Sequence, residues 1–510
     1  MRNPTVDLFA AAERHAERTG VVDGTGPFTY RRLLDASAAV GSALLAGERD
    51  LEEQRIAYLV PPGFAHVAAQ WGIWRAGGIA VPLALTHPEP ELAHVLDDAG
   101  VSAVLVETEL EERVRPLADA RGLRVLKTPE ALAAASRELP RLDGDRRALI
   151  LYTSGTTGRP KGVVTTHENL RAQAGMLIEA WGWTPDDRIL HVLPLHHVHG
   201  IVNVLTCALA CGATCEMLPG FDAAAVWRRL ADGDLTLFMA VPTIYSRLIA
   251  RWESASRRSR DAMSAGAARL RLMVSGSAAL PVSTLEKWKA LTGHVLLERY
   301  GMTEIGMALS NPLHGDRRPA VVGRPLPGVE VRVVDSRGDP CPEGQPGEIE
   351  VRGPGVFREY WGQPEATEAA FRGGWFRTGD VAVVEDGDHR ILGRSSVDII
   401  KTGGDKVSAL EIEEVLRGHP AVQECAVVGV DDPEWGQRVS MGVVLREGRS
   451  LTLDALRDWA RERLAVYKVP TRLLELAELP RNAMGKVQKP ELSALFASGR
   501  DGEREVKEDS

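Results

Sequence analysis

The stretch YTSGTTGRPKG, residues Tyr152 to Gly162, combines three glycines, four Ser or Thr hydroxyls and one lysine in eleven positions. It begins at the end of ALILYT, residues 148–153, a β-branched and apolar run that predicts a buried strand. Glycine lets a backbone approach a ligand closely, and ligands of α/β sheets collect at strand ends. The stretch therefore predicts a phosphate-binding loop at a strand end, with these ligands: Thr153, Ser154, Gly155, Thr156, Thr157, Gly158 and Lys161.

Two other interpretations of the loop are less satisfactory. A Walker A loop needs four residues between its first glycine and Gly-Lys-Ser/Thr, whereas GTTGRPKG has two residues between its glycines. A flexible surface loop of small polar residues would explain a short match of this kind. Further motifs continue along nearly the whole chain, which disfavours the flexible loop.

Whole-chain composition limits the fold and the partners. The 510 residues are too many for one ordinary core, so two or more domains are expected. The chain is 44% hydrophobic and 26% charged, as in soluble globular proteins, and its net charge of -9 gives no basic footprint for nucleic acid. No apolar run is long enough to span a membrane, and the N-terminus lacks an apolar signal core. We therefore expect a cytosolic protein without nucleic-acid partners.

Alternating strand and helix patterns predict parallel βαβ units. IAYLV from Ile56 and IAVPL from Ile79 are predicted strands on either side of the helical pattern FAHVAAQWGIWRAGG. After the phosphate loop, TTHENLRAQAGMLIEAW predicts a helix that begins with a capping box of Thr165 and Glu168. The apolar run IVNVLTCALAC from Ile201 predicts a buried helix.

Cysteine and histidine are clustered in this region. Cys207, Cys211 and Cys215 recur every four residues, which predicts buried thiols on one helical face. The segment RILHVLPLHHVHG contains four histidines: His191, His196, His197 and His199. A zinc site would need carboxylate or cysteine partners at ligand spacing, so a metal site at these histidines is disfavoured.

Three more segments place functional side chains directly after predicted strands. LTLFMAVPTIYSRLI puts Arg247 one helical turn past a strand end, although a solvated helix face is the usual place of an arginine. LRLMVSGSAALP and LLERYGMTEIG place the following residues at two more strand ends: Gly276, Ser277, Ala278, Glu298, Arg299, Tyr300, Gly301, Met302, Thr303 and Glu304. We expect the three strand ends to converge beside the phosphate loop.

Together these motifs resemble the adenylate-forming superfamily, which includes acyl-CoA synthetases, aryl-CoA ligases, luciferases and peptide-synthetase adenylation domains. The resemblance implies an α/β fold: a large N-terminal domain of βαβ-type sheets with a small β-barrel-like part, and a small mobile α+β lid. The implied limits are 1–393 for the large domain, 394–500 for the lid and 501–510 for a charged tail. LPLHHVHG, VPTIYSR, LMVSGSAALP and ERYGMTEIGMALS carry a closer likeness to malonyl-CoA synthetases, including the mitochondrial acyl-CoA synthetase family member that activates malonate.

The resemblance also implies roles for individual residues. The ATP site would contain the loop ligands, Gly276 to Ala278, Glu298 to Thr303, Asp380 on the ribose, and Arg394 near phosphate and ribose. Lys486, Thr303, Glu304 and His197 would be the catalytic residues, and Glu304 would bind Mg²⁺. The coenzyme A channel would be lined by Lys401, Gly403, Gly404 and Lys406. The segment just beyond Arg394 would be the swivel of the lid.

This assignment implies a two-step reaction. A carboxylate attacks the α-phosphate of ATP and pyrophosphate leaves, so that charge grows on oxygens that need fixed donors and cations. The thiol of coenzyme A then attacks the acyl-adenylate, after a lid rotation that withdraws Lys486 and brings the KTGGDK face toward the adenylate. Malonate keeps a second carboxylate, for which we expect a buried Arg247 with Ser277 and His199 as ligands.

One position departs from the family pattern, and several alternatives stay open. Asp405 stands where the family commonly has tyrosine, and it adds negative charge where coenzyme A would pass. Methylmalonate or another short acid could replace malonate as substrate. A carrier-loading adenylation domain is disfavoured because no carrier domain follows the lid, and a non-catalytic nucleotide-binding protein would not need Lys486 in PRNAMGK. The resemblance thus implies an acid–thiol ligase that forms AMP from ATP, uses Mg²⁺ and joins malonate to coenzyme A.

Overall fold

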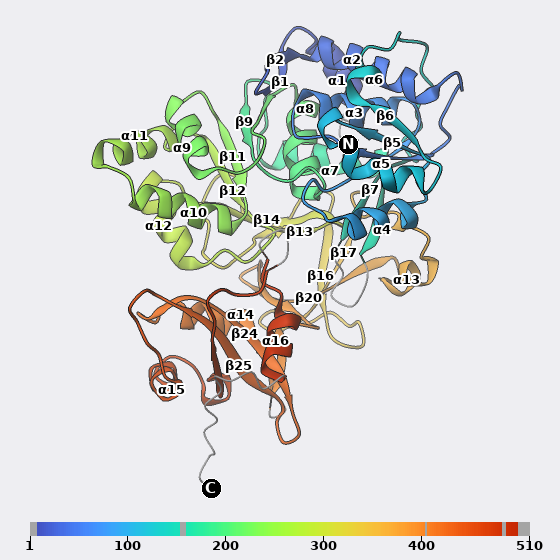
Figure 1. The fold of residues 1–510 in the computed structure, drawn as a ribbon. Coiled ribbons are helices and arrows are strands. Elements are labelled where there is room, and N and C mark those ends of the chain that lie inside the picture. The colour runs from blue at the N-terminus through green and yellow to red at the C-terminus, as the bar shows by residue number, and fades with distance from the viewer. Residues whose placement is uncertain (1–7, 154–159, 403–404, 482–485, 498–510) are drawn as a thin grey trace. The chain divides into compact units, whose positions relative to one another are not determined.

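The computed structural model describes residues 8–153, 160–402, 405–481 and 486–497. The chain divides into two compact units (Figure 1). The first unit contains residues 1–331 and 351–376, and the second contains residues 332–350 and 377–510. The predicted domain limit at Arg394 stays a prediction.

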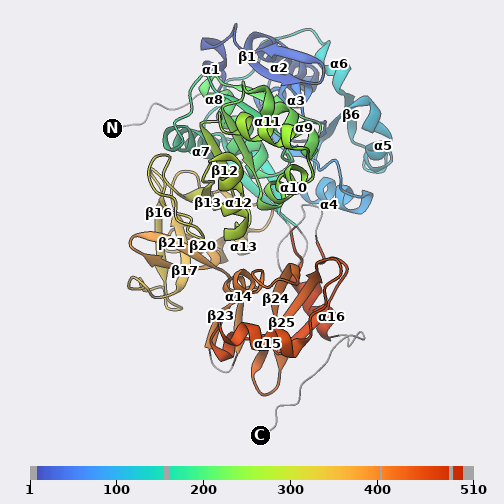
Figure 2. The same cartoon turned by 90° about the vertical axis from the view of Figure 1, so that its left-hand side faces the viewer.

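The first unit contains a nine-stranded sheet. Its strands are parallel from β13 to β1, and antiparallel strands close both edges. In spatial order they are β15 (Arg324–Pro325), β14 (Gly306–Ser310), β13 (Leu297–Met302), β12 (Leu272–Ser275), β11 (Leu237–Ala240), β9 (Arg188–His191), β10 (Thr214–Met217), β1 (Thr19–Asp23) and β2 (Gly26–Thr29). Associated helices are α1 (Leu8–Arg14), α2 (Tyr30–Leu45), α7 (His167–Ala180), the π-helix η2 (His199–Thr206), α8 (Cys207–Cys211), α9 (Ala223–Asp232), α10 (Pro242–Glu253), α11 (Arg257–Ala267) and α12 (Val282–Thr292). In two perpendicular views, α9 to α12 surround β11 and β12 (Figures 1 and 2).

A seven-stranded sheet forms the other half of the first unit. Its spatial order is β18 (Glu359–Tyr360), β8 (Lys161–Thr166), β7 (Arg147–Thr153), β4 (Ile79–Pro82), β3 (Arg55–Leu59), β5 (Ala103–Val106) and β6 (Arg124–Lys127). Its helices are α3 (Phe64–Arg75), α4 (Glu89–Ala99), η1 (Thr108–Leu110), α5 (Glu111–Asp119), α6 (Thr128–Leu132) and α13 (Pro364–Ala369). β3 and β4 are parallel and α3 connects them, so the predicted βαβ unit is confirmed.

Strand β3 shows why this sheet needs a helix layer on each face. Ile56 and Tyr58 point into the large core that also contains residues of α2, α3, α7 and the nine-stranded sheet. Ala57 and Leu59 point into a second core formed with α4 and α5. Successive residues of a strand face opposite sides, so a continuous apolar run is buried on both faces of the sheet.

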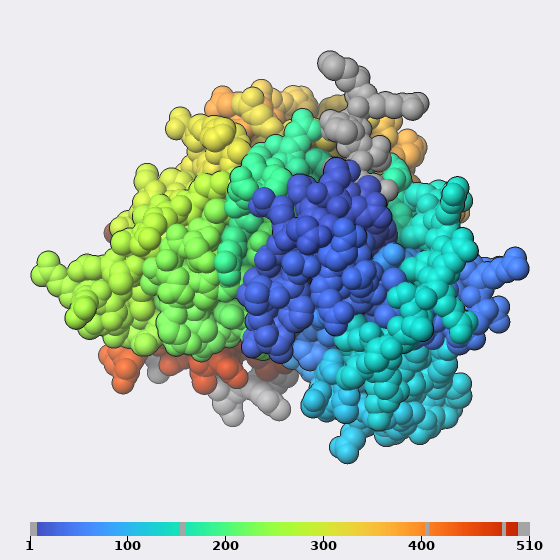
Figure 3. All heavy atoms as spheres, turned by 90° about the horizontal axis from the view of Figure 1, so that it is seen from above, coloured from blue at the N-terminus to red at the C-terminus, as the bar shows by residue number. Residues whose placement is uncertain are grey.

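Figure 3 shows the N-terminal segment (blue) between the neighbouring green and cyan segments of this unit.

A small five-stranded sheet is the counterpart of the predicted β-barrel-like part. Its spatial order is β16 (Glu330–Val334), β17 (Gly347–Arg352), β20 (Trp375–Glu385) and β19 (Phe371–Arg372), with β21 (Asp388–Arg394) paired to β20.

The second unit has an α+β core. Its sheet has the order β23 (Asp405–Ser408), β22 (Ile399–Thr402), β25 (Gly436–Leu445) and β24 (Val422–Asp432), with β26 (Arg472–Glu475) beside β25. The helices are α14 (Ala409–Leu416), α15 (Leu453–Arg461), η3 (Val466–Lys468) and α16 (Lys489–Ala497). Along β24, Val427 packs with α14 and α15, whereas Val428 packs with α16. The predicted fold class, a large α/β part and a small α+β part, is confirmed.

Two local predictions were wrong. The capping box of α7 is formed by Thr166 and Asn169, one residue beyond the predicted pair: the Thr166 hydroxyl accepts from Asn169 N at 3.1 Å, and Asn169 Oδ1 accepts from Thr166 N at 3.0 Å. Cys215 does not share a helical face with Cys207, because α8 ends at Gly212 with a φ of 87° and Cys215 lies in β10. Within the part of the chain that the structure describes, no helix is both long and apolar enough to cross a membrane.

Candidate active site

The predicted strand ends meet at one edge of the nine-stranded sheet. Ala240, the last residue of β11, pairs with Ser275, the last residue of β12, and Ser275 pairs with Glu298 in β13. The segments that follow these three residues therefore start side by side. VPTIYSR, SGSA and ERYGMTE thus lie side by side as expected, although β13 continues to Met302. Their place beside the phosphate loop stays a prediction.

Arg299 is the most unusual side chain at this edge. Its residue is 4% exposed, and its Nε and Nη2 are buried without a hydrogen-bond partner in the described part of the chain. Burial lowers the pKa of the guanidinium to about 9. A buried cation of this kind is costly unless an anion pairs with it. Arg299 therefore marks a position at which an anionic ligand would be favoured.

Gly276 makes room for this arginine. A Cβ atom at Gly276 would lie 2.5 Å from Cζ of Arg299, so the guanidinium covers the face that any other residue would fill. Gly276 is thus required for a packing reason at a site where the sequence predicted close approach to ATP.

Ser277 and His199, two of the predicted substrate ligands, are in direct contact. The Ser277 hydroxyl and His199 Nδ1 are hydrogen-bonded at 3.2 Å. Ser277 has a φ of 70°, an uncommon conformation that costs about 1 to 3 kcal/mol for a residue other than glycine. His199 is buried and is the first residue of the π-helix η2. Irregular backbone on both sides of this hydrogen bond is typical of a functional site.

His197, the predicted catalytic histidine, lies in a group of packed imidazole rings. Its ring centroid is 4.0 Å from that of His196, which in turn is 5.6 Å from that of His87. Burial, with a smaller effect of the neighbouring histidines, lowers the pKa of His196 to about 2. His196 is therefore neutral at physiological pH and contributes a polar but uncharged wall next to His197.

Tyr360 connects the two sheets at the predicted metal ligand. Its hydroxyl donates to Glu304 Oε1 at 3.0 Å, and Lys161 Nζ lies 5.0 Å from the centroid of its ring. Glu304 is 6% exposed. A carboxylate oxygen is the type of ligand that Mg²⁺ prefers, and Mg²⁺ commonly takes one or two carboxylates together with substrate phosphates. Glu304 fits that chemistry.

The stretch predicted to bind phosphate follows a strand, as expected, and its role in phosphate binding stays a prediction. β7 ends at Thr153, β8 begins at Lys161, and these two residues pair across the antiparallel strands. Five predicted loop ligands lie outside the described residues: Ser154, Gly155, Thr156, Thr157 and Gly158. Of the remaining predicted ATP ligands in the first unit, Ala278 is exposed, whereas Tyr300, Gly301, Met302 and Thr303 are partly buried.

In the second unit the predicted ribose and phosphate ligands form an ion pair. Arg394 Nε donates to Asp380 Oδ1 at 3.0 Å, and the two residues are register partners in β20 and β21. Asp380 is 9% exposed. Its carboxylate is thus held in place from one side by Arg394.

The predicted coenzyme A residues and the catalytic lysine are also in the second unit. Lys401 in β22 is exposed and pairs with Lys406 in β23. Gly403 and Gly404 lie outside the described residues, as does the side chain of Lys406. Lys486 is exposed and follows a segment, 482–485, that is not described.

The expected burial of Arg247 is wrong. α10 buries Ile244, Tyr245, Leu248 and Ile249, and Arg247 lies on the exposed side of the same helix. The helical position after VPT fixes the turn on which Arg247 lies, but packing of the neighbouring apolar residues decides which face is covered. Its role as a substrate ligand stays a prediction.

Two features of this site were not predicted from the sequence. Tyr360 was not among the predicted residues, because FREYWG has no spacing that links it to Glu304. Arg299 was assigned to ATP binding, and its isolation in the core gave no signal in the sequence. Only its place as a charged residue in a predicted buried strand, directly after Glu298, could have indicated it.

Comparisons with known proteins place the chain among enzymes of known activity. It is 49% identical to "malonate–CoA ligase ACSF3, mitochondrial" of Mus musculus, over 97% of this chain and 91% of that protein. The structure is similar to that of ATP-bound MatB from Rhodopseudomonas palustris, with a TM-score of 0.89, 34% identity and coverage of 97% of this chain and 99% of that one. It is also similar to o-succinylbenzoate CoA synthetase (MenE) from Bacillus subtilis with an acyl-adenylate intermediate, with a TM-score of 0.84, 27% identity and coverage of 99% of both chains.

These relatives contradict the cytosolic prediction. The word "mitochondrial" is part of the name of the mouse relative and of those in Xenopus laevis, Bos taurus and Homo sapiens. The prediction was wrong because the lack of an apolar signal core argues only against secretion. Mitochondrial targeting uses amphipathic, arginine-rich segments instead.

Two family models cover most of the chain. The model described as "AMP-binding enzyme" matches residues 8–361, and the model described as "AMP-binding enzyme C-terminal domain" matches residues 411–486. The first alone spans more than half of the 510 residues. With the aligned strand ends, the paired Asp380 and Arg394 and the buried cation Arg299 in place, these matches identify the chain as a member of the AMP-binding enzyme family.

Proposed function

We propose that this protein ligates malonate to coenzyme A with ATP, through a malonyl-adenylate, and releases AMP and pyrophosphate. The relatives named malonate–CoA ligase support the substrates, since they include the mouse protein and one from Arabidopsis thaliana that is 41% identical over 95% of this chain. The observation that carries the proposal is the buried Arg299, a cation without a counter-charge among the described residues at the edge where the acid must bind.

Malonate suits this site because of its second carboxylate. After the first carboxylate becomes a mixed anhydride with the α-phosphate, the second keeps its charge and needs a cation. Arg299 supplies that cation, and the hydrogen-bonded pair of Ser277 and His199 adds polar groups at the same sheet edge. Arg247 on the neighbouring helix is a second candidate cation for the open side of the substrate. An apolar acid would leave Arg299 buried and unpaired, which is unfavourable.

In the first step the carboxylate oxygen of malonate attacks the α-phosphate and pyrophosphate leaves. Lys161 and Thr303 in the first unit and Lys486 in the second are the proposed donors to phosphate oxygens, and Asp380 binds the ribose hydroxyls. Mg²⁺, when bound, neutralises charge on the phosphates. Glu304 would hold it, and the Tyr360 hydroxyl orients that carboxylate.

In the second step the thiolate of coenzyme A attacks the acyl carbon and AMP leaves. The proposed channel residues Lys401 and Lys406 pair across β22 and β23. Thr402 pairs with Gly436, so the adjacent Trp435 lies beside this hairpin. Trp435 is 38% exposed, and an exposed tryptophan offers a stacking surface to the nucleotide end of coenzyme A.

One substrate panel tests the proposal. Purified protein is incubated with ATP, Mg²⁺ and coenzyme A and with acetate, malonate, methylmalonate, succinate or octanoate, and AMP and thioester are measured. The highest kcat/KM is expected for malonate, and methylmalonate is the second candidate because it carries the same two carboxylates. A preference for acetate or octanoate would refute the dicarboxylate assignment, and AMP formation without thioester would refute the second step.

A further inference from the structure

Lys489 is a buried lysine that the proposed reaction does not use. It is the first residue of α16, three residues after Lys486, and is 8% exposed. Its Nζ lies 2.6 Å from Asp398 Oδ1 and 2.7 Å from Glu413 Oε1. Burial by itself would lower the pKa of this ammonium, but the charges of Glu413 and Asp398 outweigh burial and raise it. Lys489 therefore stays charged and is held between two carboxylates.

Asp398, one of the two carboxylate partners of Lys489, lies in the segment beyond Arg394. Asp398 Oδ2 accepts a hydrogen bond from the backbone N–H of Arg394 at 3.0 Å, so one carboxylate binds both Arg394 and Lys489. Gly393 permits this turn: its φ is 123°, and a Cβ there would lie 2.3 Å from Cβ of Asp398. The carboxylate of Asp398 thus closes the turn 394–398 and attaches it to α16.

Glu413, the other carboxylate partner of Lys489, lies in the interior of the second unit. Glu413 lies in α14, its Oε1 also accepts from Val427 N at 2.8 Å, and its Oε2 pairs with Arg417 Nη2 at 3.0 Å. These contacts join α14 to β24 and do not involve the turn. Lys489 therefore has one ion pair within the core of the unit and one to the turn.

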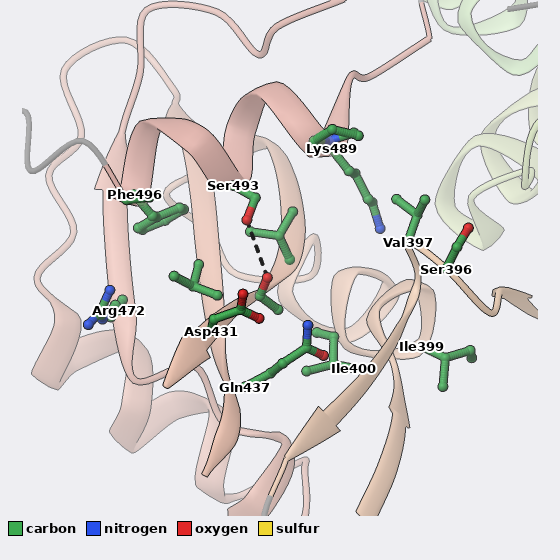
Figure 4. A pocket seen from close by; sticks show the side chains of 15 residues that line it. Ser396, Val397, Ile399, Ile400, Asp431, Gln437, Arg472, Lys489, Ser493 and Phe496 are labelled. Atoms are coloured by element: carbon green, nitrogen blue, oxygen red, sulfur yellow. Dashed lines mark hydrogen bonds between the residues drawn. The ribbon is translucent and has the colours of Figure 1, made fainter. Parts of the chain in front are cut away.

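Apolar packing holds α16 on the sheet but does not take over the role of the ion pair between Lys489 and Asp398. α16 is seated on the sheet by Leu492, which lies so close to β25 that a Cβ at Gly442 would be 2.7 Å from its Cδ1. Between α16 and the turn, by contrast, lies a cavity of about 680 Å³, lined on opposite sides by Ser396 and Val397 and by Ser493 and Phe496. Figure 4 shows the Lys489 side chain reaching from the start of α16 toward Val397 and Ser396.

We propose that Lys489 is a positioning residue, which fixes the Lys486 segment relative to the turn 394–398 through Asp398. This inference rests on the proposed function, because it concerns the lysine of the adenylation step. The two segments are then carried together, and the position of Lys486 depends on an ion pair outside the reacting groups. Loss of the ion pair should impair the step that uses Lys486 and spare the step that does not.

The test compares the two half-reactions in the full-length protein. Lys489→Met and Asp398→Asn are each assayed for acid-dependent exchange of pyrophosphate with ATP, and for thioester formation from supplied acyl-adenylate and coenzyme A. We expect exchange to fall about 10- to 100-fold, as for a misplaced catalytic group, with thioester formation within about twofold of the unaltered protein. Lys489→Arg should restore most of the exchange activity.

Glu413→Gln is the matched control, since it removes the other ion pair of the same lysine. It is expected to lower the melting temperature and leave the ratio of the two half-reactions unchanged. An equal fall in both half-reactions in Lys489→Met, or a selective loss in Glu413→Gln, would overturn the proposal. If Lys489→Met does not fold, Asp398→Asn decides, because it leaves Lys489 paired with Glu413.

The acid used is the one that the unaltered protein prefers in the substrate panel. A wrong assignment to malonate therefore changes the acid but not the comparison between variants. An unaltered protein without acid-dependent exchange would refute the proposed function, and the positioning role with it.

Discussion

Replacement of Arg299 by methionine separates the substrate role of this residue from a structural role. Methionine is unbranched and apolar, so it can occupy much of the space over Gly276 without a charge. In the described part of the chain, Nε and Nη2 of Arg299 have no hydrogen-bond partner to lose. The substitution should therefore remove a cation that has no partner among the described residues of the free enzyme.

The magnitude follows from the burial of the guanidinium. Burial lowers the pKa of Arg299 from 12.5 to about 9, which corresponds to about 5 kcal/mol of disfavoured charge in the free enzyme. An anionic substrate that pairs with Arg299 recovers part of this free energy. Loss of one partner of a buried charge pair costs about 2 to 5 kcal/mol, so kcat/KM for malonate should fall about 30- to 5,000-fold. The free variant should be equally stable or more stable by about 1 to 4 kcal/mol.

Steady-state kinetics with malonate and acetate, together with urea unfolding, measure both effects. Arg317→Met is the matched control, because Arg317 is a partly buried arginine whose pKa is also lowered by burial, but it donates to the carbonyls of Pro312, Val295 and Leu313. That control should lose stability and keep its preference for malonate over acetate. Arg299 is a structural residue if Arg299→Met destabilises the protein as Arg317→Met does, or if kcat/KM falls by the same factor for malonate and acetate.

Four further predictions concern single residues. Gly276→Ala should displace Arg299, since the added Cβ would lie 2.5 Å from its Cζ, and should lower kcat/KM for malonate by about 10- to 100-fold; an unchanged selectivity over acetate would contradict this. Asp380→Ala should weaken ATP binding by about 0.5 to 3 kcal/mol through lost ribose hydrogen bonds, read from the KM for ATP; an unchanged KM in a folded variant would remove Asp380 from the site. Lys486→Ala should abolish adenylate formation and spare thioester formation from supplied malonyl-adenylate, and equal loss of both would contradict the swivel. Burial lowers the pKa of His66 to about 4, against an opposing hydrogen bond to the Val60 carbonyl. The folded state thus favours the neutral ring, and the stability present above pH 6.5 should fall by about 3 kcal/mol as the pH drops toward 4. Urea unfolding at pH 7 and 4.5 should show a smaller loss in His66→Gln than in the unaltered protein.

The sequence alone determined the order of the predicted strands and helices, the position of a loop between Thr153 and Lys161, and the family. That this loop binds phosphate stays a prediction. These features are local: apolar periodicity fixes the type of an element, and a run of glycines and hydroxyls predicts a ligand wherever the run lies. The alignment of the ends of β11 and β12 could also be predicted, because parallel strands end at a common edge. β13 instead continues past Glu298 to Met302, where it pairs with β14. The predicted capping box was one residue too early. Thr165 and Thr166 are the same residue type, and only the end of β8 decides which of them caps α7.

Tertiary structure decided which side chains at that edge are buried and which meet. Arg247 and Arg299 both follow predicted strands, yet Arg247 is on the exposed side of α10 and Arg299 is in the core. Tyr360 reaches Glu304 because β18 pairs with β8 in the other sheet. Lys489, Asp398 and Glu413 come from three elements that meet only in the folded second unit. Burial and pairing are properties of the packed arrangement: the cost of a buried charge depends on what surrounds it, and residues distant in the sequence supply those surroundings.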